Sequence, residues 1–126
     1  MPDDYAGAAK RHFEDAEHLA GLNRFDNAGH LMGFAGECAM KKKLRDLNRQ
    51  PAAQYDGHHP KPQTMIRSAM NRRGMNGPWL SLCAGPVLFS NWSVDQRYLA
   101  DNHVDQQTYA EWKKLSARLI SLAQIR

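Results

Sequence analysis

Residues 24–47, RFDNAGHLMGFAGECAMKKKLRDL, carry the clearest periodic pattern in the chain and decide its fold. Small and medium apolar residues recur there at helical spacing, at Ala28, Leu31, Met32, Ala35 and Ala39. Beyond Met40 the pattern changes to lysines and an arginine, whose positive charges suit the negative C-terminal end of a helix. The stretch therefore predicts one long helix, Asn27–Leu47, whose first half is buried.

A second helix is predicted directly before it, at Asp3–Leu22. Apolar residues again recur every three or four positions, and charged residues lie between them. Gly21 and Asn23 end the pattern, since glycine is a common residue at a helix C-terminus. Because the link to the next helix is short, we expect the two helices to pack as an antiparallel hairpin.

The remaining sequence predicts later helices around an irregular insert. Residues 48–63, NRQPAAQYDGHHPKPQ, contain three prolines and one glycine, which is typical of a loop. We expect a short helix at Thr64–Arg73, another at Trp92–Asn102 and a long final helix at Asp105–Gln124. Residues 74–91 stay open between a buried extended segment and a helix fragment. Together these elements predict a single domain, residues 1–126, of the all-α class: an up-down antiparallel bundle of four main helices with an irregular insert.

Composition limits the classes of function only broadly. The chain has 126 residues, 42% of them hydrophobic, and a formal net charge of +4. This charge permits contact with nucleic acid without requiring it. No apolar run approaches the length of a membrane span, and two distant cysteines, Cys38 and Cys83, favour free thiols over a disulfide framework. We therefore expect a reduced, cytoplasmic protein that does not contact membranes.

The histidines do not predict a metal centre. His58 and His59 are adjacent, with Asp56 nearby, in a segment that is predicted to be a solvated loop. Adjacent residues do not present two ligands on one helix face, and no cluster has the spacing of a zinc site. We predict no metal and no cofactor.

The densest positive cluster begins at the C-terminal end of the long helix. We predict a nucleic-acid-binding surface formed by Lys41, Lys42, Lys43, Arg45, Arg72 and Arg73. The alternative is a solvated helix end that binds nothing. Glu37 lies four residues before Lys41, so it either forms a helix-stabilising ion pair or lines a cleft.

The expected hairpin and the last third of the chain resemble HEPN domains, a helical family named for higher eukaryotes and prokaryotes nucleotide-binding. The first helix contains Asp15-Ala16, and the second reads A-x-x-L-x-x-F-A-x-E-x-A-x-K from Ala28 to Lys41. Residues 91–115, NWSVDQRYLADNHVDQQTYAEWKKL, are similar to the second half of the family. The resemblance implies an all-helical domain that forms a homodimer.

The same resemblance implies a pair of catalytic residues. Ribonucleases of the family carry an arginine and a histidine separated by four to six residues, and here Arg97 and His103 enclose YLADN. An arginine stabilises charge that develops on a phosphate, and a histidine moves protons near neutral pH. Tyr98 stands where the ribonucleases have a polar residue, and Trp92 followed by Arg97-Tyr98 is similar to non-catalytic members. We expect Glu37 and Tyr98 to line the cleft that holds this pair.

Helical geometry leaves the role of this pair open. On an unbroken helix, six residues place His103 about 120° from Arg97. The two side chains converge only if the helix breaks between them or if a second subunit supplies one of them. The alternative is an Arg97 in an ion pair and an exposed His103.

Three functions remain open at the level of the sequence. The first is a HEPN-like binding module that acts on a protein partner or on RNA or a nucleotide. The second is a metal-independent endoribonuclease of toxin type, with an antitoxin as partner. The third is a structural dimerisation module. Salt-sensitive RNA binding favours the first two, and RNA cleavage that resists a chelator selects the second.

Overall fold

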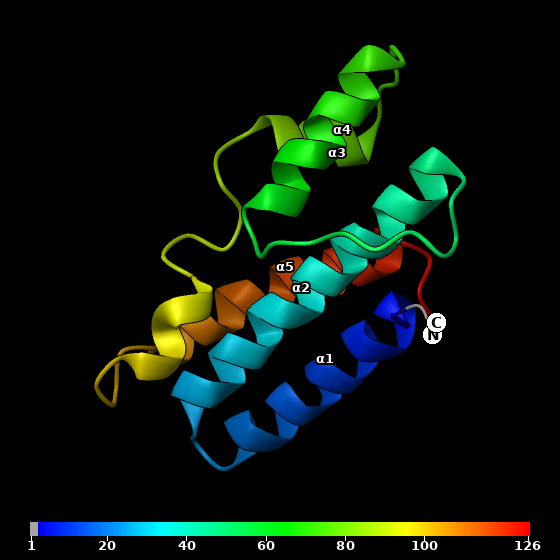
Figure 1. The fold of residues 1–126 in the computed structure, drawn as a ribbon. Helices are drawn as coiled ribbons and strands as arrows, with labels where there is room; N and C mark the ends of the chain where they lie inside the picture. Colours follow the sequence, from blue (N-terminus) through cyan, green and yellow to red (C-terminus); the bar gives the residue numbers. More distant parts are fainter. Residues whose placement is uncertain (1–2) are drawn as a thin grey trace.

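The structure, a computed structural model that describes residues 3–126, is helical and has no strand over that range. Its elements are α1 (Tyr5–Gly21), α2 (Phe25–Asn48), α3 (Lys61–Arg72), α4 (Pro78–Ala84), the 3₁₀ turn η1 (Val94–Tyr98) and α5 (Gln106–Leu122) (Figure 1). Within residues 3–126, no helix has the length and apolar character needed to cross a membrane. The prediction of the all-α class is confirmed.

α1 and α2 form the hairpin that their two apolar stripes predict. Asp4 caps α1 by accepting a hydrogen bond from the Gly7 N–H (2.9 Å). The connection is three residues long, and its middle residue, Asn23, adopts a left-handed backbone conformation (φ 59°). The observed bounds differ from the predicted ones by only one or two residues at each end.

α5 packs against α2 and runs in the same direction (Figure 1), and it also contacts α1, because the Tyr109 hydroxyl donates to Glu17 Oε1 (2.7 Å). Near its start, the Val104 N–H donates to Asp26 Oδ1 (2.9 Å) at the beginning of α2. Near its end, Lys42 Nζ donates to the Ala123 carbonyl (2.7 Å). Asp105 caps α5 by accepting from the Thr108 N–H (2.7 Å). α2 is thus the central helix, with α1 and α5 as its neighbours.

Aromatic side chains from distant segments pack against glycines of α2. A Cβ atom at Gly33 would lie 2.1 Å from Nε1 of Trp92, and one at Gly36 would lie 2.3 Å from Cζ of Phe89. Both aromatic residues are buried, and Trp92 Nε1 donates to the His30 carbonyl (3.2 Å). The segment between α4 and α5 is therefore held against α2 by side chains that need a glycine beneath them.

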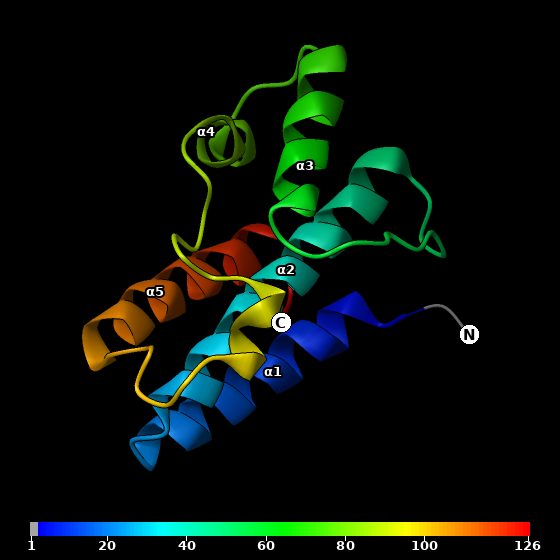
Figure 2. The same cartoon turned by 60° about the vertical axis from the view of Figure 1, so that its left-hand side comes forward.

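α3 and α4 pack together at one end of α2 and project away from the layer that α1, α2 and α5 form (Figures 1 and 2). Gln63 links this arm to the following loop, because its amide accepts from the Leu88 N–H (2.8 Å) and donates to the Pro86 carbonyl (3.0 Å). The predicted up-down bundle of four main helices is therefore not confirmed. Three helices lie side by side, and α3 stands apart from them.

The helix predicted at Trp92–Asn102 is wrong. Only residues 94–98 are helical, and they form a short 3₁₀ turn. The backbone is extended at Ser93 and at Leu99, and Asn91 and Asn102 have positive φ values of 68° and 67°. The inward packing of Trp92 and the attachment of residues 102–104 to Asp26 stabilise this irregular path over a regular helix.

Two other boundaries differ from the sequence prediction. α3 begins at Lys61, three residues before the expected Thr64, because Pro62 lies in its first turn and needs no N–H partner there. The open segment 74–91 contains the short helix α4, which also starts with a proline, followed by an irregular stretch from Gly85.

Candidate functional site

A stripe of polar and aromatic residues runs along one face of α2. Asp26, His30, Phe34, Glu37 and Lys41 follow one another at intervals of four, four, three and four residues. This spacing places all five on a single helix face. We call this set the α2 stripe. The loops 49–60 and 89–104 contact it, so residues far apart in the sequence meet there.

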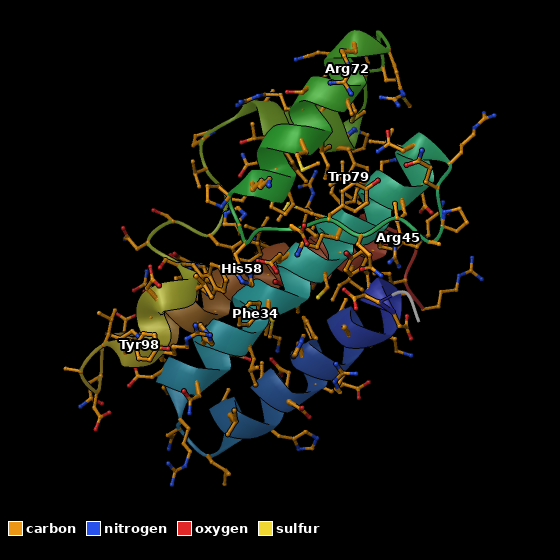
Figure 3. The ribbon with its side chains drawn as sticks, viewed as in Figure 1. Phe34, Arg45, His58, Arg72, Trp79 and Tyr98 are labelled. Atoms are coloured by element: carbon orange, nitrogen blue, oxygen red, sulfur yellow. The ribbon has the colours of Figure 1, made fainter. Side chains whose placement is uncertain are left out.

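Phe34 is the centre of an aromatic cluster on this stripe. Its ring centroid lies 4.8 Å from that of His30, 5.3 Å from Trp92, 5.7 Å from His58 and 5.9 Å from His12. Figure 3 shows Phe34 and His58 near the middle of the molecule. The rings come from α1, α2 and both loops, and Phe34 itself is only partly buried.

Glu37 is a buried carboxylate that holds loop 49–60 against α2. Its side chain is 4% exposed and accepts from the His59 N–H (2.8 Å). Lys41 Nζ lies 3.5 Å from the carboxylate, and His58 Nδ1 lies 3.3 Å from it. The ion pair with Lys41 is one of the two alternatives that the sequence leaves open for Glu37. The tie to the two loop histidines was not predicted.

His103 is held in a defined orientation beside the start of α2. Its Nδ1 lies 2.9 Å from the Ala100 carbonyl and 3.4 Å from Asp26 Oδ1. Both neighbours are acceptors, so Nδ1 carries a proton and, in the neutral ring, Nε2 holds the free electron pair. Nε2 is buried without a hydrogen-bond partner among the described residues.

Arg97 forms no hydrogen bond with His103 within residues 3–126. Its guanidinium stacks on Tyr98, 5.0 Å from the ring centroid, and no ion pair to Arg97 is found within residues 3–126. Tyr98 is 76% exposed, so it lies at the surface beside Arg97 rather than within an enclosed cleft. The helix break that the pair requires is present at residues 99–102.

His30 contacts both Phe34 of α2 and Trp92 of loop 89–104. Its ring stacks on Trp92 with an interplanar angle of 23°. Burial lowers the pKa of His30 below its usual value, and the positive charge of Arg97 lowers it further. His30 is therefore a neutral ring at pH 7. His12 and His30 have no ligand spacing to each other, so the sequence favours ordinary surface or satisfied histidines; the four-residue intervals from Asp26 to Phe34 do place His30 on the same helix face as Phe34.

The predicted basic surface divides into side chains that bind within the protein and side chains that face solvent. Lys41 pairs with Glu37, and Lys42 bonds both Asp46 (2.7 Å) and the Ala123 carbonyl. Arg45 is 8% exposed, and its guanidinium lies 3.9 Å from the ring centroid of Tyr5.

Further bonds fix Arg45 as a structural residue. Its Nε donates to the Ala53 carbonyl (2.7 Å), and its Nη1 donates to the Asp3 carbonyl. Arg45 thus joins the N-terminus and loop 49–60 to α2, and Figure 3 shows it where these segments meet. These contacts remove Lys41 and Arg45 from any surface that a long polyanion reaches.

The other predicted cations lie toward α3 and α4. Lys43 is partly buried, with its Nζ 5.8 Å from the Trp79 ring centroid. Arg73 is exposed and donates to the Ala69 carbonyl (2.9 Å) and to Asn48 Oδ1 (2.8 Å). Arg72 is exposed, near the tip of α3 in Figure 3.

Charge is unevenly distributed along the chain. Residues 57–94 contain Lys61, Arg67, Arg72 and Arg73 and no Asp or Glu. This segment alone therefore carries a formal charge of +4, which equals that of the whole chain. The remaining residues are balanced. The projecting arm formed by α3 and α4 is thus the positive pole of the molecule.

No group of three or more His, Cys, Asp or Glu residues that is arranged to hold a metal ion occurs in residues 3–126. Cys38 and Cys83 are both free thiols, and burial raises the pKa of each to about 11.

Comparison of the chain with protein-family models, curated proteins and solved structures finds no match.

Proposed function

We propose that this chain is a HEPN-like RNA-binding module that holds the sugar-phosphate backbone of RNA on its positive arm. The observation that carries the proposal is the confinement of the net charge to residues 57–94. An uncompensated group of cations on a projecting element attracts a polyanion, and it does so without reading sequence. The hairpin sequence, which resembles HEPN domains, supports the family assignment.

A groove beside the arm supplies the local geometry. It has a volume of about 510 Å³ and lies between the end of α2 and the end of α3. Lys43, Arg49 and Arg73 line it together with Asn48, and the one acid there, Asp46, is already paired with Lys42. Arginine guanidinium groups bind phosphate through several N–H donors, so this groove suits a phosphodiester.

Binding to RNA is tested by its dependence on salt. The dissociation constant for a fluorescein-labelled single-stranded RNA is measured by anisotropy at several salt concentrations, for the wild type and for Arg49→Gln/Arg72→Gln/Arg73→Gln. Each phosphate contact on a single strand contributes about 0.7 to the slope of log affinity against log salt. We expect the triple variant to lose about 2 from this slope.

The matched control removes three exposed cations elsewhere, in Lys10→Gln/Lys114→Gln/Arg118→Gln. It lowers the net charge equally but leaves the arm intact, so its slope stays close to that of the wild type. Equal losses in both triple variants contradict a specific surface on the arm. Absence of salt-dependent binding in the wild type rejects the proposed function altogether.

A second candidate, a metal-independent endoribonuclease, is favoured by the orientation of His103. Its Nε2 holds the free electron pair that takes a proton from a ribose 2′-hydroxyl, while Arg97 stabilises charge on the phosphate. Because Nε2 is buried, cleavage requires loop 99–104 to shift. Cleavage in EDTA that His103→Ala and Arg97→Ala each abolish, with helicity unchanged, supports this candidate. If RNA binds but is not cleaved, the ribonuclease candidate is rejected and the binding module remains.

The proposal also includes the oligomeric state and the cellular location of the protein. Leu22, Tyr98 and Leu99 are 70%, 76% and 55% exposed, and they flank the place where the α1–α2 turn meets residues 101–104. Exposed apolar side chains at one end of a small domain support a homodimer or contact with a protein partner such as an antitoxin. The two free thiols support a cytoplasmic location. Light scattering that gives twice 14.3 kDa at micromolar concentration supports the dimer.

A further inference from the structure

A cavity beside Phe34 lies between the first half of α1 and the middle of α2. Its volume is about 370 Å³. The rings of Phe34 and His12 both line it, with centroids 5.9 Å apart and planes inclined at 37°. The cavity is therefore bounded by two adjacent aromatic surfaces, one from each helix of the hairpin.

Charged groups surround these rings. Arg11 is exposed and lines the same cavity, and the paired side chains of Lys41 and Glu37 lie deeper in it. Asp3 and Asp4 also line the cavity. A flat molecule with an apolar face and a polar edge fits this combination of aromatic surfaces and charged groups.

We propose that this cavity is a base-stacking subsite, in which one nucleobase of a single-stranded RNA lies against Phe34 and His12. The adjoining phosphate contacts the guanidinium of Arg11. This inference rests on the proposed RNA binding and adds a second, non-ionic mode of contact to it. Every base has a π face, so stacking of this kind accepts any sequence.

The lining favours a base within a strand over a free nucleotide. The three carboxylates Asp3, Asp4 and Glu37 repel a triphosphate, whereas a single phosphodiester beside Arg11 adds only one negative charge. The state of His12 suits stacking as well. Burial lowers the pKa of His12, and the charge of Arg11 lowers it further, so at pH 7 the ring is neutral.

The subsite and the groove beside the positive arm are placed to bind one strand together. Phe34 and Arg49 are fifteen residues apart on and just beyond α2, which corresponds to about 22 Å along the helix. A single-stranded RNA several nucleotides long spans this distance. The arm then supplies ionic contacts to phosphates, and the cavity supplies one anchored base.

The test compares an ordinary RNA oligonucleotide with a strand of the same length that lacks bases. Anisotropy titrations are made with wild type, Phe34→Leu and His12→Ala. Loss of one stacked base weakens binding of the ordinary RNA about tenfold. The slope against salt stays the same, because stacking releases no counterions. The abasic strand binds all three proteins equally. Phe34→Tyr keeps a ring at this position and restores the affinity.

Phe13→Leu is the matched control, since Phe13 also lies on the hairpin but lines the groove between α1 and α5. It leaves RNA binding unchanged. If Phe34→Leu and His12→Ala bind RNA as tightly as the wild type, the subsite is refuted while the function of the arm stands. If the wild type binds no RNA, both proposals are overturned together. His12→Ala keeps the test decisive even if Phe34→Leu loses helicity.

Discussion

Removal of the Glu37 carboxylate tests whether one buried acid attaches loop 49–60 to the helical layer. The Glu37→Leu variant leaves the buried His59 N–H without its 2.8 Å acceptor, which costs about 1–3 kcal/mol. It also leaves the Lys41 ammonium, whose side chain is 11% exposed, without its carboxylate partner. Breaking such a buried pair typically costs about 3–5 kcal/mol.

Two features of the site reduce the expected loss. Lys41 Nζ stays 5.8 Å from the Tyr5 ring centroid, and His58, whose side chain is 49% exposed, turns to water. We therefore expect Glu37→Leu to lower the free energy of unfolding by about 3 kcal/mol. At about 4 °C per kcal/mol for a domain of this size, the melting temperature falls by about 12 °C. Glu37→Gln keeps an acceptor for the His59 N–H and loses about half as much.

The assay is urea unfolding followed by far-ultraviolet circular dichroism, with an unchanged dependence on urea as the sign of two-state behaviour. Glu111→Leu, on an exposed position of α5, is the control and changes stability by less than about 0.5 kcal/mol. Lys41→Met in the Glu37→Leu background recovers part of the loss, because it removes the unpaired ammonium. If Glu37→Leu is as stable as the control, Glu37 does not anchor the loop.

Three further predictions concern packing and charge on either side of α2. A Cβ atom at position 33 would lie 2.1 Å from Nε1 of Trp92, so Gly33→Ala displaces this ring. We expect the substitution to lower the free energy of unfolding, measured in urea, by about 2 kcal/mol. Asp26→Asn flattens the acid limb of the stability profile as the pH falls below the ordinary Asp pKa of 3.8. Burial raises the pKa of Asp26, but backbone N–H groups outweigh it and hold the pKa below its usual value. The wild-type carboxylate thus adds stability above its unfolded pKa that is lost as the pH falls through the folded pKa. Tyr109→Phe removes the 2.7 Å bond to Glu17 and lowers the melting temperature by about 4 °C.

The helices α1, α2 and α5 could be predicted because the patterns that specify them lie within a few consecutive turns of sequence. The apolar stripes of α1, α2 and α5 have helical spacing over four or more turns, and caps such as Asp105 mark where they begin. The failed helix at residues 92–102 contains no Gly or Pro, so no local residue excludes a helix there. Its path is set by Trp92 against Gly33 and by Asp26 binding residues 102–104, and these contacts join positions far apart in sequence.

The candidate site was predicted only in part for the same reason. The Glu37–Lys41 pair is visible at four-residue spacing, and the break needed near His103 is visible in Asp101-Asn102. In the sequence, Phe34 lies beside the apolar stripe of its own helix. Its aromatic partners come from α1 and from two loops, and no periodic pattern brings those segments together.

The run of three lysines shows how helical geometry divides a charge cluster that looks continuous in sequence. Consecutive residues on a helix differ by about 100°, so Lys41, Lys42 and Lys43 point to three different sides of α2. Lys41 faces Glu37, Lys42 reaches Asp46 and the end of α5, and Lys43 lies over Trp79 near the arm. Only the last of them adds to a surface that a phosphate chain reaches. The cations of residues 57–94 differ because no acid occurs among them, so their field is not cancelled locally. Charge segregation, rather than the local density of lysines, therefore locates the positive surface of this protein.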